Sequence, residues 1–394
     1  MKKRKLNLIW KILIGIALGI GIGWVAPEWC GRPAATLNYI FSQLLGFLIP
    51  LIIVGFVTPA IADVGSRAGK LLIVTALLAY FFTFCSGMLS YFTGVMTFPS
   101  LIAGEEGVAA VEEAAHLKPY FTVDIPAPMP VMTALVISFM FGLGVAFIKG
   151  DVMRGFFTEM REIVQKTIQK PIIPLLPYYI FCIFLVMTVE GQVGTILATF
   201  VKIIVIIFVL HVLVLVLQYC VAGCFVGRNP FKMLVTMLPA YLTALGTQSS
   251  AATIPVTLRQ TIKMGVDEDV AGFVVPLCAT IHMSGSALKI TACALALLIM
   301  HGQPYDIGLF IHFVAMLGVT MIAAPGIPGG SIMASLGLLS TILGFDQQMI
   351  ALMIALYIAM DSFGTACNVT GDGAIATIVG RFFSKSAAVR ETHP

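Results

Sequence analysis

Long apolar segments recur along the whole chain, and most of them are long enough to cross a lipid bilayer. A transmembrane helix needs about 20 mostly apolar residues, and short connectors separate stretches of this kind here. The chain is 59% hydrophobic and 11% charged, with a mean hydropathy of +1.00, against about 45–50% and about 25% in soluble domains. These features predict a single integral membrane domain over residues 1–394, in an all-α polytopic fold.

The first half of the chain alternates regular spans with connectors that carry Lys and Arg. It begins with MKKRK and an apolar run longer than the core of a secretory signal, which predicts an uncleaved first span. Because basic connectors stay in the cytoplasm, we expect both termini on the cytoplasmic side of the inner membrane and an acidic external loop over residues 99–130. The next predicted spans are 37–61, 70–96, 131–148, 171–189 and 196–225.

Beyond residue 232 the apolar segments are interrupted by polar or Gly-Pro stretches. Two segments, about 233–264 and 310–345, each have two arms too short to cross the bilayer and a tip that favours a turn. Each predicted hairpin is followed by a span, over about 270–300 and 347–384, and the two hairpins enter from opposite sides. Eight transmembrane helices with two re-entrant hairpins in inverted repeats are typical of a secondary transporter, because non-helical backbone within a membrane lines a cavity or is buried in protein.

The last segment places two acids on one face of an apolar helix. Asp361, Thr365, Asn368 and Asp372 are spaced i, i+4, i+7 and i+11. A carboxylate at this depth costs about 2.5–3.5 kcal/mol on insertion scales, so such residues are usually functional. The two acids lie about 16 Å apart along a helix, at 1.5 Å per residue. The spacing therefore predicts two separate sites, suited to an ammonium group or to Na+.

Four motifs resemble those of the dicarboxylate/amino acid:cation symporter family, the glutamate-transporter homologues. QSSAATIPVT and GIPGGS resemble the tips of its first and second hairpins, ATIHMSGSALK stands where the family has ATINMDGTALY, and DSFGTACNVTGD where it has DMGRTxxNVTGD. The resemblance is strongest from about residue 232 to 381. It implies a homotrimer in which a transport domain (spans three and six with residues 230–385) moves like an elevator against a scaffold (spans one, two, four and five).

The resemblance also implies a role for individual residues. Asp361 stands at the acid that binds the substrate's ammonium group, and Asn368 and Ser250 at positions that hold its carboxylate. The implied substrate site comprises Ser249, Ser250, Ser286, Ile327, Ser331, Asp361, Thr365 and Asn368. The implied Na+ ligands are Cys278, Thr280, His282, Asn368 and Asp372. No organic cofactor and no nucleic-acid partner are expected.

Two positions depart from acidic-substrate transporters. Gly364 stands where they carry an Arg, and Gln248 stands where some relatives have an Arg in the first hairpin tip. A bidentate Arg is the usual partner of a desolvated carboxylate. The sequence therefore favours a small neutral amino acid (serine, threonine or alanine), with an acidic amino acid or a C4-dicarboxylate as the alternative.

The coupling residues depart from the family as well. Ser284 replaces the acid that helps bind a third Na+, and His282 replaces the neighbouring Asn. Lys289 is unusual within a span, and its ammonium group could stand in for a missing cation or simply pair structurally. Na+ is the expected coupling ion, with H+ as the alternative because His282 could titrate.

Other functional classes fit the residues less well. An aspartyl protease needs two acids close enough to share a proton, which the spacing of Asp361 and Asp372 forbids. A serine protease needs a base beside its nucleophile, and residues two apart on a helix, such as His282 and Ser284, face different ways. We therefore expect no enzyme, and a channel stays a remote alternative because re-entrant loops also build filters.

Overall fold

The computed structural model describes residues 8–66, 70–102, 117–148, 150–191, 193–322, 324 and 329–383, and the regular elements of these residues are all helical. The helices of the first half are α1 (Leu8–Val25), α2 (Gly31–Ser66), α3 (Lys70–Ile102), α5 (Val131–Phe147), α6 (Asp151–Thr167), α7 (Ile173–Val189) and α8 (Val193–Val226). Those of the second half are α9 (Pro230–Thr236), α10 (Leu238–Thr247), α11 (Ser250–Lys263), α12 (Glu268–Ile281), α13 (Ser284–Met300), α14 (Ile307–Ile322), α15 (Gly330–Thr341), α16 (Gln347–Ala359) and α17 (Asp361–Phe383). A short 3₁₀ turn, Glu28–Cys30, precedes α2.

Several helices are long and apolar enough to cross a membrane. Among the described residues five meet this criterion, and the bent pair α16 and α17 makes a sixth if it counts as one span. The helices α1 and α5, which match the predicted first and fourth spans, are apolar but shorter. The chain is therefore a polytopic helical protein, and the count of eight spans stays a prediction.

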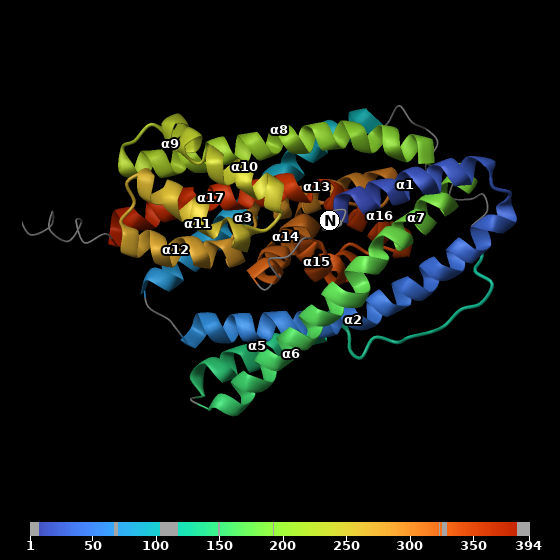
Figure 1. Ribbon diagram of the computed structural model, residues 1–394, viewed down its shortest axis with the longest axis horizontal. Coiled ribbons are helices and arrows are strands. Elements are labelled where there is room, and N and C mark those ends of the chain that lie inside the picture. Colours follow the sequence, from blue (N-terminus) through green and yellow to red (C-terminus); the bar gives the residue numbers. More distant parts are fainter. Residues whose placement is uncertain are drawn as a thin grey trace, which may run out of the picture.

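The helices pack in two groups. The helices α1, α2, α5, α6 and α7 contact one another extensively, as do α3, α8 and α10 to α17. In Figure 1, α2, α5 and α6 lie along the lower edge and α8 along the upper edge, with α13 to α17 between them. The resemblance implies a scaffold and a mobile transport domain, and this division stays a prediction.

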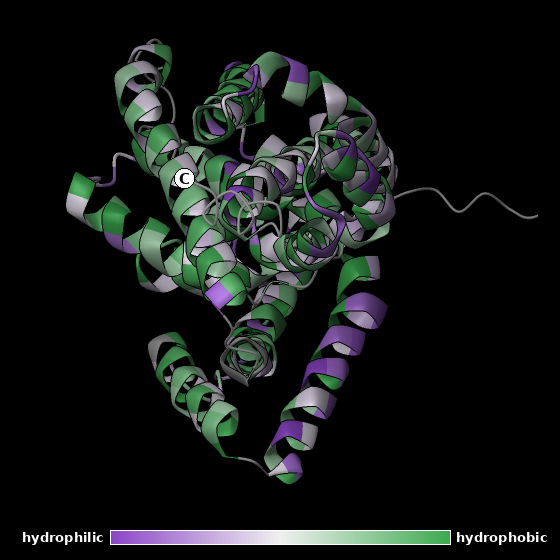
Figure 2. Ribbon diagram, turned by 90° about the vertical axis from the view of Figure 1, so that its left-hand side faces the viewer, coloured by the Kyte–Doolittle hydropathy of each residue, from purple (hydrophilic) through white to green (hydrophobic). Residues whose placement is uncertain are grey.

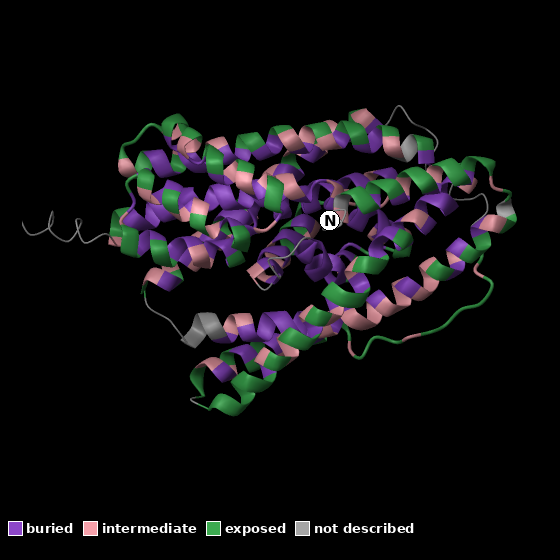
Figure 3. Ribbon diagram, in the orientation of Figure 1, coloured by how far each residue is buried: buried purple, intermediate pink, exposed green. Residues whose placement is uncertain are grey.

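Apolar side chains cover much of the outer surface. Val201, Val205, Val209 and Val212 are exposed along one side of α8, and hydrophobic colour predominates on the ribbon in Figure 2. By contrast, α13, α15 and α17 are buried along most of their length, as Figure 3 shows. An apolar exterior around a buried helical centre suits a protein whose solvent is lipid.

The two predicted hairpins appear as helix pairs. In the first, α10 ends at Gln248, which adopts a left-handed conformation (φ 54°, ψ 27°), and the hydroxyl of Ser249 caps α11 by accepting a hydrogen bond from Ala252 N at 3.3 Å. In the second, α14 and α15 flank a tip of which Ala324 and Gly329 are described. Gly329 takes φ 75°, a conformation that glycine adopts without a Cβ penalty.

The basic connector before the fifth span is itself helical. Residues 151–167 form α6, and a π-helical turn over Ile168–Ile172 joins it to α7. Pro171 lies in this turn, and because proline has no N–H it disrupts the regular ladder of hydrogen bonds there.

The last span is broken, which the sequence interpretation did not predict. The helices α16 and α17 meet at Met360 with a bend of 63°. Asp361 is therefore the first residue of α17. The backbone oxygens of Tyr357 and Met360, at the end of α16, lie near the Lys289 ammonium group that contacts Asp361. The predicted span over about 270–300 is also broken, since α12 and α13 are separated by His282 and Met283.

Candidate functional site

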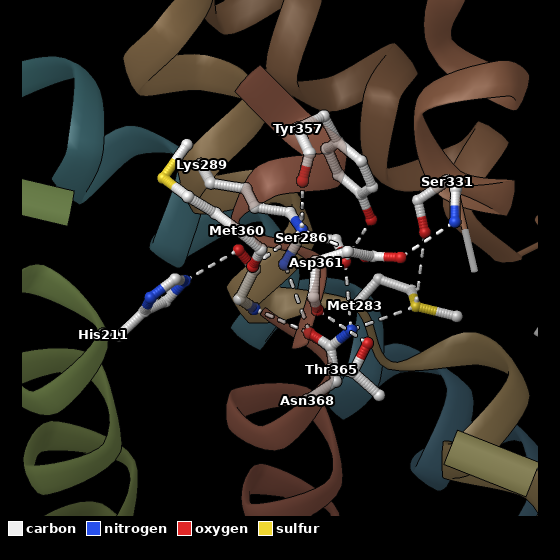
Figure 4. A network of polar contacts seen from close by, with 12 residues as sticks. His211, Met283, Ser286, Lys289, Ser331, Tyr357, Met360, Asp361, Thr365 and Asn368 are labelled. Carbon is white, nitrogen blue, oxygen red and sulfur yellow. Dashed lines mark hydrogen bonds and ion pairs between the residues drawn. The ribbon is translucent and has the colours of Figure 1, made fainter. Parts of the chain in front are cut away.

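Asp361 is the centre of a buried polar network at the start of α17 (Figure 4). The residue is only 3% exposed. Its Oδ1 accepts a hydrogen bond from Lys289 Nζ at 3.1 Å, and its Oδ2 accepts one from the backbone N–H of Gly329 at 2.8 Å. The carboxylate therefore links α13, α17 and the tip of the second hairpin.

Lys289 is fully buried, and its ammonium group is surrounded by electron-rich partners. Besides Asp361, Nζ lies 3.4 Å from the backbone oxygens of Tyr357 and Met360 and 3.4 Å from the centre of the Tyr357 ring. Both oxygens also accept a backbone N–H at the junction of the two helices, Tyr357 O from Met360 N and Met360 O from Gly364 N, each at 3.2 Å, and a carbonyl oxygen has a second lone pair for Lys289. A carboxylate, two carbonyls and an aromatic face together stabilise a buried cation.

Asn368, about two turns beyond Asp361 along α17, caps the start of α13. Its Oδ1 accepts hydrogen bonds from Gly285 N at 2.8 Å and Ser286 N at 3.3 Å, and its Nδ2 donates to Ser286 Oγ at 3.1 Å and to Met283 Sδ at 3.3 Å. Met283 at the N-cap position supplies no side-chain cap, so this amide satisfies two N–H groups that would otherwise lack partners.

Asp372 forms the second buried pair of α17, with His282. The Nδ1 atom of His282 lies 2.9 Å from Asp372 Oδ1 and 3.2 Å from the backbone oxygen of Asn368. Both partners are acceptors, so Nδ1 carries the hydrogen. The Nε2 atom of this ring and Oε1 of Gln218 on α8 are buried without a hydrogen-bond partner within the described residues.

The two acids of the stripe thus lie on one helix but have different partners, as the spacing predicted. Thr365 Oγ1 donates to the backbone oxygen of Asp361 at 2.9 Å. Each acid is paired with a nitrogen-bearing side chain from the stretch between His282 and Lys289, and these pairings were not predicted.

The other predicted residues occupy several places. Ser331 Oγ lies 3.8 Å from Met283 Sδ, at the edge of the Asp361 network. Ser249, Ser250 and Gln248 form the tip of the first hairpin, where Gln248 and Ser250 are buried, and both helices of this hairpin pack against α17. Ile327 lies outside the described residues.

The predicted Na+ ligands Cys278 and Thr280 lie on α12. The backbone oxygen of Cys278 accepts the N–H of His282 at 2.8 Å. Thr280 is exposed, and its hydroxyl donates to the backbone oxygen of Leu277 at 2.7 Å. The structure therefore brings Cys278 next to His282 and leaves the side chain of Thr280 away from the buried network.

Gly364 makes room for Lys289. A Cβ added at Gly364 would lie 2.8 Å from Nζ and 2.9 Å from Cε of Lys289, closer than real Cβ atoms approach their neighbours. The absence of a side chain at residue 364 and the presence of a lysine at residue 289 are therefore two parts of one arrangement.

Two residues of the network were missed from the sequence. Tyr357 supplies a ring face to Lys289, and its hydroxyl lies 3.1 Å from Ser286 Oγ. His211 on α8 donates from Nε2 to the backbone oxygen of Gly285 at 3.1 Å. A tyrosine and a histidine within apolar spans are the signals that could have pointed to them.

A comparison with known protein families identifies the family of the chain. The model of the sodium:dicarboxylate symporter family matches residues 8–382, almost the whole chain. The chain belongs to this family. The resemblance found in the sequence is thereby confirmed, and the protein is a multi-pass membrane protein of a transporter family rather than of an enzyme family.

The residues expected to hold Na+ in this family member do not form an open cation site. The Asp372 carboxylate and the Asn368 carbonyl both accept from the His282 ring, and the Cys278 carbonyl is part of the helix. A cation that bridged these two oxygens would compete with the imidazole N–H. With the side chains in this arrangement, the imidazole therefore already engages Asp372 Oδ1 and the backbone oxygen of Asn368, two of the oxygens expected to bind Na+.

Proposed function

We propose that the protein is a secondary active symporter that carries a small neutral amino acid, of the serine, threonine or alanine class, together with a monovalent cation. The observation that supports this most directly is the Lys289–Asp361 pair. Its two charges cancel, and a zwitterion adds no net charge to the site. An aspartate or a dicarboxylate would add negative charge without an Arg to balance it, and an uncompensated buried charge costs several kcal/mol.

The two oxygens of Asp361 have separate roles in this proposal. Oδ1 keeps Lys289, while Oδ2 exchanges the Gly329 N–H for the ammonium group of the substrate, since an ionised carboxylate can accept several hydrogen bonds. The substrate carboxylate then lies toward Asn368, whose NH₂ group is a donor. Binding and closure of the second hairpin tip would compete for one oxygen, which links substrate occupancy to the conformation of the tip.

The family supports the remaining parts of the proposal. We infer alternating access by an elevator movement, a homotrimeric assembly and Na+ or H+ as the coupling cation. The buried polar centre and the apolar exterior are compatible with a carrier, in which a solute is enclosed while it crosses the membrane.

A second candidate substrate is an acidic amino acid, and one observation favours it. Lys289 Nζ occupies the space beside Gly364 where acidic-substrate relatives begin their Arg side chain. If Lys289 left Asp361 when the substrate bound, its ammonium could pair with a side-chain carboxylate. This candidate requires the buried pair to open.

Uptake into proteoliposomes tests the proposal. We expect labelled L-serine to accumulate under an inward cation gradient, and unlabelled serine, threonine and alanine to compete at least about tenfold better than aspartate or succinate, which corresponds to about 1.4 kcal/mol. Asp361→Asn should abolish this uptake. Preferred uptake of aspartate would support the second candidate, and no gradient-driven uptake of these solutes would contradict the proposal.

A further inference from the structure

Both carboxylates of α17 are paired with nitrogen-bearing side chains of the same chain, and both partners come from one short stretch. His282 and Lys289 lie seven residues apart, at the break before α13 and within α13. They pair with Asp372 at 2.9 Å and with Asp361 at 3.1 Å, and all four side chains are almost completely buried. Each acid of α17 is therefore paired in the same way, with a side chain of the stretch that includes the start of α13.

The surroundings of Lys289 are those of a monovalent cation site. Its Nζ faces one carboxylate oxygen and two backbone oxygens from the last turn of α16. Carbonyls at a helix C-terminus carry partial negative charge and favour a cation, and backbone carbonyls with carboxylates are the ligands that bind monovalent cations in transporters. The lysine ammonium occupies the centre of this set.

The ring of His282 occupies a second such place. Its Nδ1–H donates to the Asp372 carboxylate and lies 3.2 Å from the Asn368 carbonyl, which are two of the oxygens expected to bind Na+. One N–H group thus takes two oxygens that an ion would otherwise need. The Phe82 ring lies edge-on to the imidazole, with the ring centroids 6.4 Å apart.

We propose that the side chains of His282 and Lys289 take the places of bound cations beside Asp372 and Asp361. The substrate site on α17 then keeps its structure without Na+. A group attached to the chain is always present and loses no translational freedom on binding. Affinity for substrate then does not depend on the external Na+ concentration, and of the two coupling cations in the proposed function this inference selects H+. This inference deepens the proposed transport function and rests on it for the meaning of the site, although its first test needs no substrate.

The first test compares the wild-type protein in NaCl, KCl and choline chloride of equal ionic strength. An ion that binds the native state raises stability with its concentration, so the melting temperature of the purified protein should be the same in the three salts. His282→Asn frees the oxygens at Asp372, and we expect this variant to gain a saturable, Na+-specific rise in melting temperature. His312→Asn is the matched control because this histidine is exposed on α14.

The results separate the tethered role from a structural one. If His282 only stabilises the fold, His282→Asn lowers the melting temperature equally in every salt, and the inference fails. A saturable Na+-specific shift in the wild-type protein also overturns it. If His282→Asn does not fold, the melting temperatures of the wild-type protein and of Lys289→Gln in the three salts test the inference instead, with Lys232→Gln as the control. Lys289→Gln should then gain the Na+-specific rise that the control lacks.

A binding measurement links the inference to transport. The Kd of the wild-type protein for L-serine should change by less than about twofold when choline replaces Na+, and a tightening of about tenfold or more in Na+ would overturn the inference. If no L-serine binds in any salt, the proposed substrate is wrong, while the melting experiment still tests the tethered groups. The two failures are therefore distinguishable.

Discussion

Removal of one partner from the Lys289–Asp361 pair should destabilise the protein strongly. Both side chains are buried, at 0% and 5% exposure, so the remaining charge cannot reach water. Breaking a buried pair by removing one partner costs about 3–5 kcal/mol, and Lys289→Met also loses the contact with the Tyr357 ring, which adds about 0.5–2 kcal/mol. Asp361 keeps the N–H of Gly329, which places the expected cost of Lys289→Met near 4 kcal/mol rather than higher.

The combined variant distinguishes a charge effect from simple loss of packing. Lys289→Met with Asp361→Asn removes both charges together, and replacing a buried pair by neutral groups is often close to neutral. The double variant should therefore cost less than the sum of the two single variants by at least about 2 kcal/mol, within the range found for residues in direct contact.

Equilibrium unfolding in mixed detergent micelles measures these free energies, and Lys232→Met is the matched control because that lysine is exposed on α9. The control should change the free energy of unfolding by less than about 0.5 kcal/mol. Additive costs in the double variant, or single costs below about 1 kcal/mol as for an exposed pair, would refute the account of the buried pair.

Three further substitutions test the close packing of the site. Gly364→Ala should cost about 1–3 kcal/mol of unfolding free energy, because its Cβ would meet Lys289. The control Gly272→Ala on α12, where an added Cβ meets nothing, should stabilise the protein by about 0.5–1 kcal/mol. Equal effects of the two substitutions would contradict the close packing of Gly364 against Lys289. Gly329→Ala should cost about 1–2 kcal/mol because of its positive φ, and an unchanged melting temperature would show that the tip does not hold this conformation. Asn368→Ala should cost about 1–3 kcal/mol of unfolding free energy, because it leaves the N–H groups of Gly285 and Ser286 without partners. An unchanged free energy of unfolding would contradict the capping role of Asn368.

Much of the architecture could be predicted because it follows from local sequence. The length of the apolar runs predicts the spans, and the tip residues around Gln248 and Gly329 predict the hairpins. The helical spacing of Asp361 and Asp372 correctly places them on one helix. These features need only neighbouring residues to determine them.

The chemistry of the site depended on contacts that local sequence does not contain. Lys289 meets Asp361 across 72 positions, and His282 meets Asp372 across 90. The break at Met360, beside Lys289, has no Pro or Gly at that residue to indicate it. The interpretation of Gly364 as the position of a missing Arg stays a prediction, and the sequence did not indicate that the end of the Lys289 side chain lies against this glycine.

An experimental structure with L-serine bound tests the central claim most directly. We expect the amino group of serine at Oδ2 of Asp361, in place of the Gly329 N–H, and the carboxylate of serine toward Asn368, while Lys289 Nζ stays on Oδ1. Serine bound elsewhere, with Asp361 still joined to both Lys289 and Gly329, would contradict the assignment of Asp361 as the substrate's anchor.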